Sequence, residues 1–121
     1  MSHKVFVLDD DQISCDLARQ ALDHAGYRVE TLTRTIGATA IIRTFNPDLI
    51  LLDIMMPAIS GENVFEIIDK TLRPRPEVLF YSNKSAVELR ELVKKTGVEG
   101  YVCKVDGPAN LVKQVKQALE A

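Results

Sequence analysis

Apolar residues occur in five short runs, separated by longer segments in which apolar positions recur with a helical spacing. Four of the runs are almost continuous in Val, Ile, Leu, Phe and Tyr, a pattern typical of strands covered on both faces. The remaining run, 28–32, has only Val29 and Leu32 as strongly apolar residues, so we expect it at an edge of the sheet. The predicted strands are Val5–Leu8, Arg28–Leu32, Leu49–Leu52, Val78–Tyr81 and Tyr101–Cys103.

The segments between these runs predict helices, because their apolar residues recur every three or four positions. The predicted stripes are Ile13, Leu17, Ala18, Ala21, Leu22 and Ala25; Ile36, Ala40, Ile41 and Phe45; Val64, Phe65, Ile67, Ile68 and Leu72; Leu89, Leu92 and Val93; and Leu111, Val112, Val115, Ala118 and Leu119. Asp11 is placed to cap the first helix, and Gly26 to end it. The fourth helix is expected to run from about Ser85 to Gly97, and Pro108 suits the first turn of the last helix.

Strand and helix alternate five times, which predicts an α/β fold with a parallel sheet covered by helices. Ligands of such sheets bind beyond the carboxyl ends of the strands. Asp9 and Asp10 follow the first predicted strand, Asp53 the third, Ser82 the fourth and Lys104 the fifth. We therefore expect three acids, a hydroxyl and an amine to meet at one rim of the sheet.

This group of side chains predicts chemistry on an anion beside a cation. Asp9 and Asp10 would repel each other and Asp53 without a cation among them, and carboxylate oxygens suit Mg²⁺. A phosphoryl group fits best, because Mg²⁺ and Lys104 can neutralise its charge and Ser82 can donate to its oxygens. Asp53 is then the expected nucleophile, and the product is an aspartyl phosphate.

Length, composition and charge exclude several other classes of protein. The chain has 121 residues, 46% of them hydrophobic, and a net charge of −2, which fits one globular domain without a basic surface for nucleic acid. Cys15 and Cys103 fit small buried hydrophobes in a reducing compartment. The N-terminus lacks a signal-peptide pattern, and no apolar stretch approaches the ~20 residues that span a bilayer, so we expect a cytoplasmic protein without membrane contact.

Two catalytic alternatives lack the residues they need. His3 precedes the first strand and His24 ends the first helix, so both are predicted at the rim opposite the acids. This placement argues against a Ser-His-Asp or Cys-His hydrolase. Neither glycine-rich nucleotide-binding pattern is present in the chain.

The order and spacing of these residues resemble the receiver domain of two-component response regulators, the family that includes the chemotaxis receiver. The resemblance covers essentially the whole chain, 1–121. It depends on Asp9-Asp10, Asp53 with Met56-Pro57 and Gly61, Ser82, and Tyr101-x-x-Lys104. It implies a flavodoxin-like (βα)5 three-layer sandwich with the parallel strand order 2-1-3-4-5.

The resemblance also implies which acid accepts the phosphoryl group and which acids bind the metal. Asp53 matches the phosphoacceptor of the family, and Asp10 matches a direct Mg²⁺ ligand, with Asp9 acting mainly through water. The backbone carbonyl of Met55 matches the third protein ligand of the metal.

Three further residues match the family's switching and charge-pairing positions. Lys104 matches the lysine that pairs with the phosphoryl group. Ser82 matches the switch hydroxyl, and Tyr101 matches the aromatic residue whose rotamer reports activation.

The partners are also implied by the resemblance. We expect a histidine kinase or phosphotransfer protein as phosphoryl donor, and a downstream protein or output domain that binds the surface of the fourth helix, fifth strand and fifth helix. The domain would assist its own phosphorylation and dephosphorylation, so we do not expect an enzyme. Two alternatives stay open: a pseudo-receiver that binds partners without phosphorylation, and a small Mg²⁺-dependent phosphatase.

Three departures from the family pattern stand out, and one of them is Met55 with Lys84, at positions that tune how fast the acyl phosphate hydrolyses. The family's lysine is usually followed by a proline in a cis peptide, whereas Val105 follows Lys104 here. A cis bond before a residue other than proline costs about 2.5–4 kcal/mol, so we predict a trans bond and a different path for this connection, with Gly107-Pro108 resetting the backbone. Asn83 stands where a very small residue is common.

Overall fold

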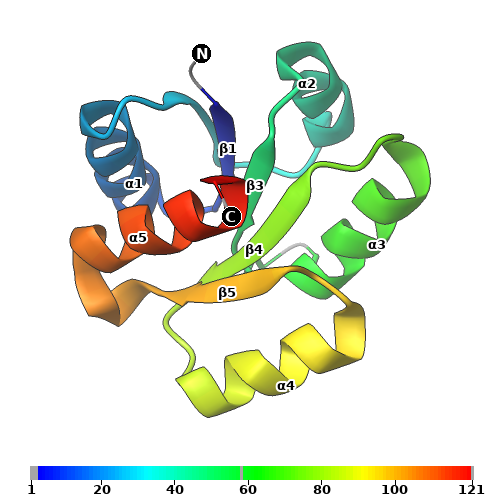
Figure 1. Cartoon of the computed structure of the whole chain (residues 1–121). Coiled ribbons are helices and arrows are strands. Elements are labelled where there is room, and N and C mark those ends of the chain that lie inside the picture. The colour runs from blue at the N-terminus through cyan, green and yellow to red at the C-terminus, as the bar shows by residue number, and fades with distance from the viewer. Residues whose placement is uncertain (1–2, 58, 121) are drawn as a thin grey trace.

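A computed structural model describes residues 3–57 and 59–120 and shows a five-stranded parallel sheet (Figure 1). The strand order β2-β1-β3-β4-β5 confirms the predicted flavodoxin-like fold and places 28–32 at an edge. The strands are β1 (Lys4–Leu8), β2 (Arg28–Leu32), β3 (Leu49–Leu52), β4 (Glu77–Ser82) and β5 (Gly100–Cys103).

Helices cover both faces of this sheet. They are α1 (Gln12–His24), α2 (Ala38–Phe45), α3 (Gly61–Thr71), α4 (Ala86–Thr96) and α5 (Gly107–Glu120), with a short 3-10 turn, η1 (Lys104–Asp106), before α5. In Figure 1, α1 and α5 lie side by side on one face, and α2, α3 and α4 lie on the other. Within the described residues, no helix combines the length and apolar character that crossing a membrane requires.

The continuous apolar strands divide their side chains between two cores. In β1, Phe6 and Leu8 pack with residues of α2, α3 and α4, whereas Val5 and Val7 pack with residues of α1 and α5. All four side chains are fully buried. The two-sided burial explains why β1 and β3 lack the alternation of an exposed strand.

The register of β1 and β3 brings the predicted acids together. Leu8 pairs with Leu52 at the carboxyl ends of these neighbouring strands. The hydrogen bonding between the two segments continues one residue beyond β3, because the Asp53 N–H donates to the Leu8 carbonyl at 2.9 Å. Asp9 and Asp53 therefore leave the sheet at the same level.

Side-chain caps begin three of the helices. Asp11 accepts from the Ile13 N–H in α1, Ser60 from the Asn63 N–H in α3, and Ser85 from the Glu88 N–H in α4. Each cap satisfies a backbone donor that the first turn leaves unpaired. The predicted Asp11 cap, Ser85 boundary and Gly97 end of α4 are confirmed.

The predicted apolar stripe of α1 is partly wrong. Ile13 and Leu17 are 69% and 57% exposed, and the buried hydrophobic residues of α1 are Cys15, Ala18 and Leu22. A helix turns by about 100° per residue, so Ile13 points away from the side on which Cys15 is buried. Only the side of α1 that carries Cys15, Ala18 and Leu22 packs against the sheet, so Ile13 and Leu17 stay exposed to solvent.

The placement of Ile36 in the apolar stripe of the second helix is also wrong. The helix α2 begins at Ala38, after Gly37 in a left-handed conformation, and Ile36 lies outside it with 84% of its surface exposed. Its buried residues are Ala38 and Ile42. In α3, Ile67 is 44% exposed although it was placed in the predicted stripe.

Gly61 sets how closely α3 approaches the end of β3. A Cβ at this position would lie 2.6 Å from the Asp53 carbonyl oxygen and 2.6 Å from the Ile54 Cα. Both are backbone atoms, so neither can move without displacing the segment that carries Asp53. The glycine is therefore required by close packing and not by its backbone angles.

We predict that Gly61→Ala lowers the free energy of unfolding by about 1–3 kcal/mol, the usual cost of overpacking a well-filled site. Gly100→Ala is the matched control, because its new Cβ would lie 3.2 Å from the Leu79 Cδ2, a side-chain atom that can shift. Urea unfolding followed by circular dichroism measures both. Equal stability of the two variants would show that α3 does not need this close approach.

Candidate functional site

Three acids from two adjacent strand ends form a cluster at the carboxyl rim of the sheet. One carboxylate oxygen of each of Asp9, Asp10 and Asp53 lies within 4.8 Å of the others. Asp9 is fully buried and Asp53 is 4% exposed, whereas Asp10 is exposed. The structure therefore brings together the acids that the sequence singled out.

Lys104 balances the most buried acid. Its ammonium lies 2.6 Å from the Asp9 Oδ2, and its side chain is only 12% exposed. The other oxygen of Asp9 accepts from the Asp11 N–H at 2.9 Å. Although close to Lys104, the Asp9 Oδ2 has no hydrogen bond of suitable angle among the described residues. The ion pair with Lys104 is therefore the contact that compensates this buried oxygen.

Asp53 is held by its own turn and perturbed by its surroundings. Its Oδ1 accepts from the Met55 N–H at 3.1 Å. The pKa of Asp53 is raised to about 6, mainly by burial and also by the negative charge of Asp9, against the opposing effects of the Met55 N–H and Lys104. Asp53 is therefore a carboxylate whose ionisation depends on the cations near it.

Ser82 and Tyr101, the two predicted switch residues, lie on neighbouring strands. Ser82 ends β4, is 1% exposed, and accepts through its Oγ from the Lys84 N–H at 3.2 Å. Tyr101 pairs in register with Phe80 of β4 and is half-buried. It borders a cavity of about 270 Å³ lined by Ala86, Gly100, Tyr101, Cys103, Asp106, Asn110 and Gln114. This cavity lies on the surface of α4, β5 and α5.

The peptide bond after Lys104 has the trans form that the sequence predicted. Among the described residues, the only cis peptide bond is Arg73–Pro74, so the Lys104–Val105 bond is trans. Residues 104–106 form η1, and Gly107 then takes a φ of 85° before α5 continues. Val105 is 76% exposed at this turn. A glycine tolerates this backbone where other residues are strained.

Two supporting residues were not predicted to take part in the site. The Cys15 thiol donates to the Asp9 carbonyl at 3.3 Å, and burial raises the pKa of Cys15 to about 12, which keeps the thiol protonated. The Tyr81 ring lies 5.0 Å from the Lys104 ammonium. The sequence predicts both residues as part of the hydrophobic core. Their contacts with the site depend on the direction of their side chains, which only the fold shows.

The doubly wound parallel sheet, with buried acids and a lysine at its carboxyl rim, defines an α/β protein whose site lies at the ends of its strands. The chain belongs to the response regulator receiver domain family, whose model matches residues 5–116. The pseudo-receiver alternative is not supported, because the acids and the lysine of the family come together in this fold.

Two relatives illustrate the range of the family. The probable transcriptional regulatory protein TcrX of Mycobacterium tuberculosis is 32% identical over 100 residues, which cover 83% of this chain but 42% of TcrX. The polar-differentiation response regulator DivK of Brucella ovis is 26% identical over 121 residues, which cover 98% of both chains. The chain is therefore similar both to a part of a longer regulator and to the whole of a shorter one.

Solved structures agree with the fold. The chemotaxis response regulator CheY4 of Vibrio cholerae superimposes with a TM-score of 0.88 at 24% identity, covering 98% of this chain and 100% of CheY4. The BeF3-activated DrrB receiver domain superimposes with a TM-score of 0.82 at 28% identity, covering 100% of both chains. The architecture is thus shared at low sequence identity.

We predict that Asp53→Asn stabilises the metal-free protein by about 1–3 kcal/mol near neutral pH. The pKa of Asp53 is raised from 3.8 to about 6, so its charge destabilises the fold above that pH. This cost fades as the pH falls from about 6 toward the unfolded value, so the gain from the substitution should fade over the same range.

Urea unfolding in EDTA across this pH range measures the effect. Asp106→Asn, which removes an exposed carboxylate from η1, is the control and should change stability little. A stability gain for Asp53→Asn that is the same at low and neutral pH would contradict the proposed electrostatic origin.

Proposed function

We propose that Asp53 accepts a phosphoryl group from a histidine kinase or a phosphotransfer protein, and that this transfer changes the affinity of the domain for a downstream partner. The observation that carries the proposal is the convergence of Asp9, Asp10 and Asp53 with Lys104 at one rim of the sheet. Membership of the receiver family supports the same function.

The acidic cluster fits a hard divalent cation. Three carboxylates supply oxygen ligands within a small space, which is the ligand type that Mg²⁺ prefers. We propose that Asp10, Asp53 and the Met55 backbone carbonyl hold Mg²⁺, with Asp9 acting through water. When bound, Mg²⁺ supplies positive charge that offsets the carboxylates and the oxygens of the incoming phosphoryl group.

The proposed transfer is a nucleophilic displacement at phosphorus. A carboxylate oxygen of Asp53 forms the new bond to phosphorus, and the bond from phosphorus to the donor's histidine nitrogen breaks. The nitrogen leaves with the electron pair of that bond. Since the raised pKa of Asp53 is about 6, its carboxylate is mostly ionised at neutral pH and can attack.

Lys104 and Ser82 are proposed to receive the transferred charge. Lys104 begins in an ion pair with Asp9 and is close enough to the cluster to exchange that partner for a phosphoryl oxygen. Ser82 is buried at the adjacent strand end, where its hydroxyl can donate to another oxygen. The chain supplies these groups for its own modification, and we propose that it is not an enzyme acting on outside substrates.

The first test is phosphorylation by Mg²⁺ and acetyl phosphate, followed by intact mass. We predict that the protein gains the mass of one phosphoryl group, and that Asp53→Asn abolishes this gain. Asp10→Ala should lose most Mg²⁺-dependent labelling while keeping the fold, because it removes an exposed metal ligand. Asp106→Asn is the control and should be labelled normally.

Each other outcome has a clear meaning. Full labelling of Asp10→Ala would refute its role as a metal ligand. No labelling of the native chain would contradict the phosphoacceptor function. Release of phosphate over many turnovers without a stable modification would favour the phosphatase alternative.

The second test concerns the switch. We predict that Ser82→Ala still accepts phosphate, because Asp53, the metal ligands and Lys104 remain, but that it loses much of the change in partner affinity. A hydroxyl drawn toward the phosphoryl group would vacate space that Tyr101 of the neighbouring strand can fill, which would alter the surface of α4, β5 and α5.

The affinity for a partner is measured before and after phosphorylation in the native chain, in Ser82→Ala and in Tyr101→Ala. Val87→Ala, an exposed position on α4, is the control for a simple loss of contact area. If both Ser82→Ala and Tyr101→Ala kept the full affinity change, another element would carry the signal.

A further inference from the structure

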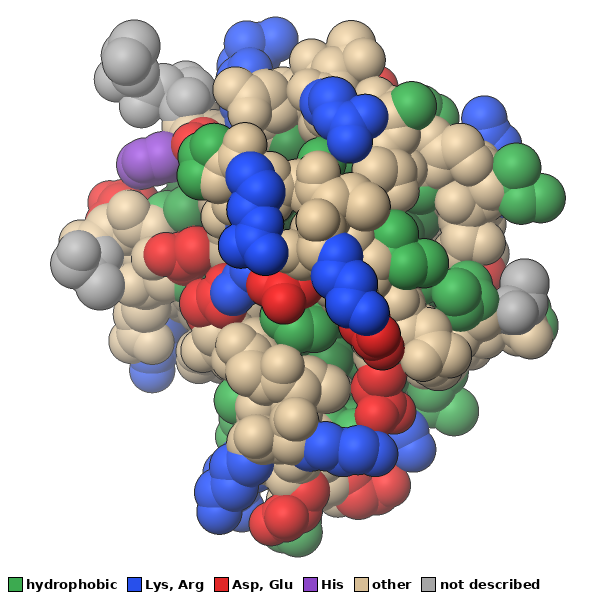
Figure 2. Space-filling view, turned by 90° about the vertical axis from the view of Figure 1, so that its right-hand side faces the viewer, with side chains coloured by type: hydrophobic (Ala, Val, Ile, Leu, Met, Phe, Trp, Pro, Cys, Tyr) green, Lys and Arg blue, Asp and Glu red, His purple; other side chains and the backbone are tan. Residues whose placement is uncertain are grey.

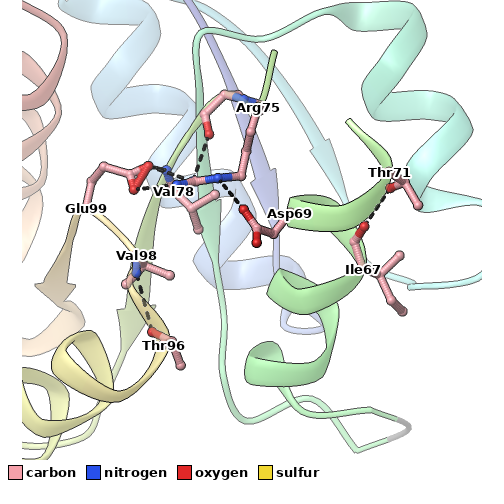
Figure 3. Close-up of polar contacts among 9 residues, drawn as sticks. Ile67, Asp69, Thr71, Arg75, Val78, Thr96, Val98 and Glu99 are labelled. Atoms are coloured by element: carbon pink, nitrogen blue, oxygen red, sulfur yellow. Dashed lines mark hydrogen bonds and ion pairs between the residues drawn. The ribbon is translucent and has the colours of Figure 1, made fainter. Parts of the chain in front are cut away.

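A charged cluster lies at the rim opposite the acids, where β4 and β5 begin (Figure 3). The Arg75 guanidinium binds both carboxylate oxygens of Glu99, at 2.7 and 3.2 Å. Its Nε lies 3.0 Å from the Asp69 Oδ1, and its Nη1 also donates to the Pro76 carbonyl at 3.2 Å. The guanidinium stands 5.0 Å from the centre of the Phe65 ring. One side chain therefore joins α3 to the loop between α4 and β5.

Glu99 is held by its backbone as well as by its side chain. Its N–H donates to the Val78 carbonyl at 3.0 Å, and its Oε1 accepts from the Val78 N–H at 3.1 Å. The side chains of Arg75 and Glu99 are 21% and 29% exposed, so water screens this pair less than a fully exposed one. A bidentate pair of hydrogen bonds between arginine and carboxylate also fixes the relative orientation of the two side chains. Glu99 is thus tied firmly to the start of β4.

This attachment lies directly behind the end of α4. Gly97 closes the helix with a φ of 85°, and its N–H donates to the Val93 carbonyl at 3.0 Å. The next residue, Val98, is buried, and its N–H lies 3.5 Å from the Thr96 Oγ1. Only two residues separate the last turn of α4 from the carboxylate of Glu99, so the helix end has little freedom to move.

The rest of α4 is held more lightly. Leu89 is its one fully buried residue among those described. Figure 2 looks onto the side of the molecule that carries α3 and α4, where Lys and Arg side chains lie among Asp and Glu. The pair between Lys95 and Glu62 spans these helices at 3.4 Å, but the Lys95 side chain is 74% exposed, so it contributes little.

The other end of α4 is connected to the proposed switch. Ser85 caps the helix, and the Lys84 N–H donates to the Ser82 Oγ at 3.2 Å. If Ser82 turns its hydroxyl toward a phosphoryl group, this turn before α4 loses a hydrogen bond. One end of the helix is therefore coupled to the site, while the opposite end is tied to the distant rim.

We infer that Arg75 and Glu99 form a clamp that holds the C-terminal end of α4 fixed, so that phosphorylation moves the helix about this end. The inference rests on the proposed function, because the movement starts at Ser82 beside phosphorylated Asp53. Displacement is largest near Ser85 and smallest at Gly97. Without the clamp, the helix end and the start of β5 would shift as well, and part of the signal would be lost there.

The experiment compares the native chain with Arg75→Gln and Glu99→Gln. Arg75→Lys is a milder variant that keeps the charge but loses the two-pronged geometry. Lys70→Gln is the matched control, because it removes a positive charge from α3 that forms only an exposed pair with Glu66. Residue-resolved amide hydrogen exchange is measured without ligand and with Mg²⁺ plus beryllium fluoride as a phosphoryl mimic.

In the native chain, we expect the mimic to change exchange in 84–90 and to leave 97–100 unchanged. In Arg75→Gln and Glu99→Gln, the Glu99 amide should exchange at least about tenfold faster without ligand, and the mimic should now alter 97–100 too. Arg75→Lys should fall between these and the native chain. Lys70→Gln should behave as the native chain does.

Two results would overturn the clamp: native-like exchange of the Glu99 amide in both Gln variants, or an equal response of 84–90 and 97–100 in the native chain. If either Gln variant fails to fold, Arg75→Lys supplies the same comparison. Acetyl phosphate labelling of Asp53 is run in parallel on every chain. A native chain that is neither labelled nor responsive to the mimic would refute the proposed function, whereas labelled chains with the wrong exchange pattern would refute the clamp alone.

Discussion

Repulsion among carboxylates in a buried pocket is the constraint on which the site depends. Asp9 is completely buried next to Asp53, and the ammonium of Lys104, 2.6 Å from Asp9, is the positive charge that compensates it in this structure. The compensation is incomplete, since burial and Asp9 still raise the pKa of Asp53 to about 6. A bound cation would reduce the repulsion among these carboxylates. Its remaining positive charge would then favour the binding of an anion at the same rim.

The fold supports this pocket with rigid strands and leaves movement to one helix. Asp9 and Asp53 extend from the two central strands, whose side chains are buried on both faces. Close packing at Gly61 holds α3 against the turn after Asp53. The helix α4 buries much less, and its two ends differ in their attachments. The acids therefore lie on rigid strands, whereas the neighbouring helix α4 can move when the charge at the site changes.

The departure from the family at Val105 is absorbed locally. The trans bond after Lys104 lies within η1, and Gly107 then takes a positive φ at the start of α5. Lys104 nevertheless reaches Asp9, because it directly follows Cys103, the last residue of β5, and so precedes the residue that departs from the family pattern. A change in the connection thus leaves the charge at the site in place.

The sequence by itself determined the order of the elements, the strand at the edge and the acids at the rim. These follow from local patterns: continuous apolar runs predict buried strands, and residues just after parallel strands share one edge. Tertiary structure decided which side of each helix is buried, so Ile13, Leu17 and Ile36 stay exposed despite their apolar character. It also decided the contacts of Cys15, Tyr81 and Arg75, because their partners are distant in sequence or depend on side-chain direction. The sequence shows which positions are apolar, whereas packing against the sheet decides which of these residues are buried.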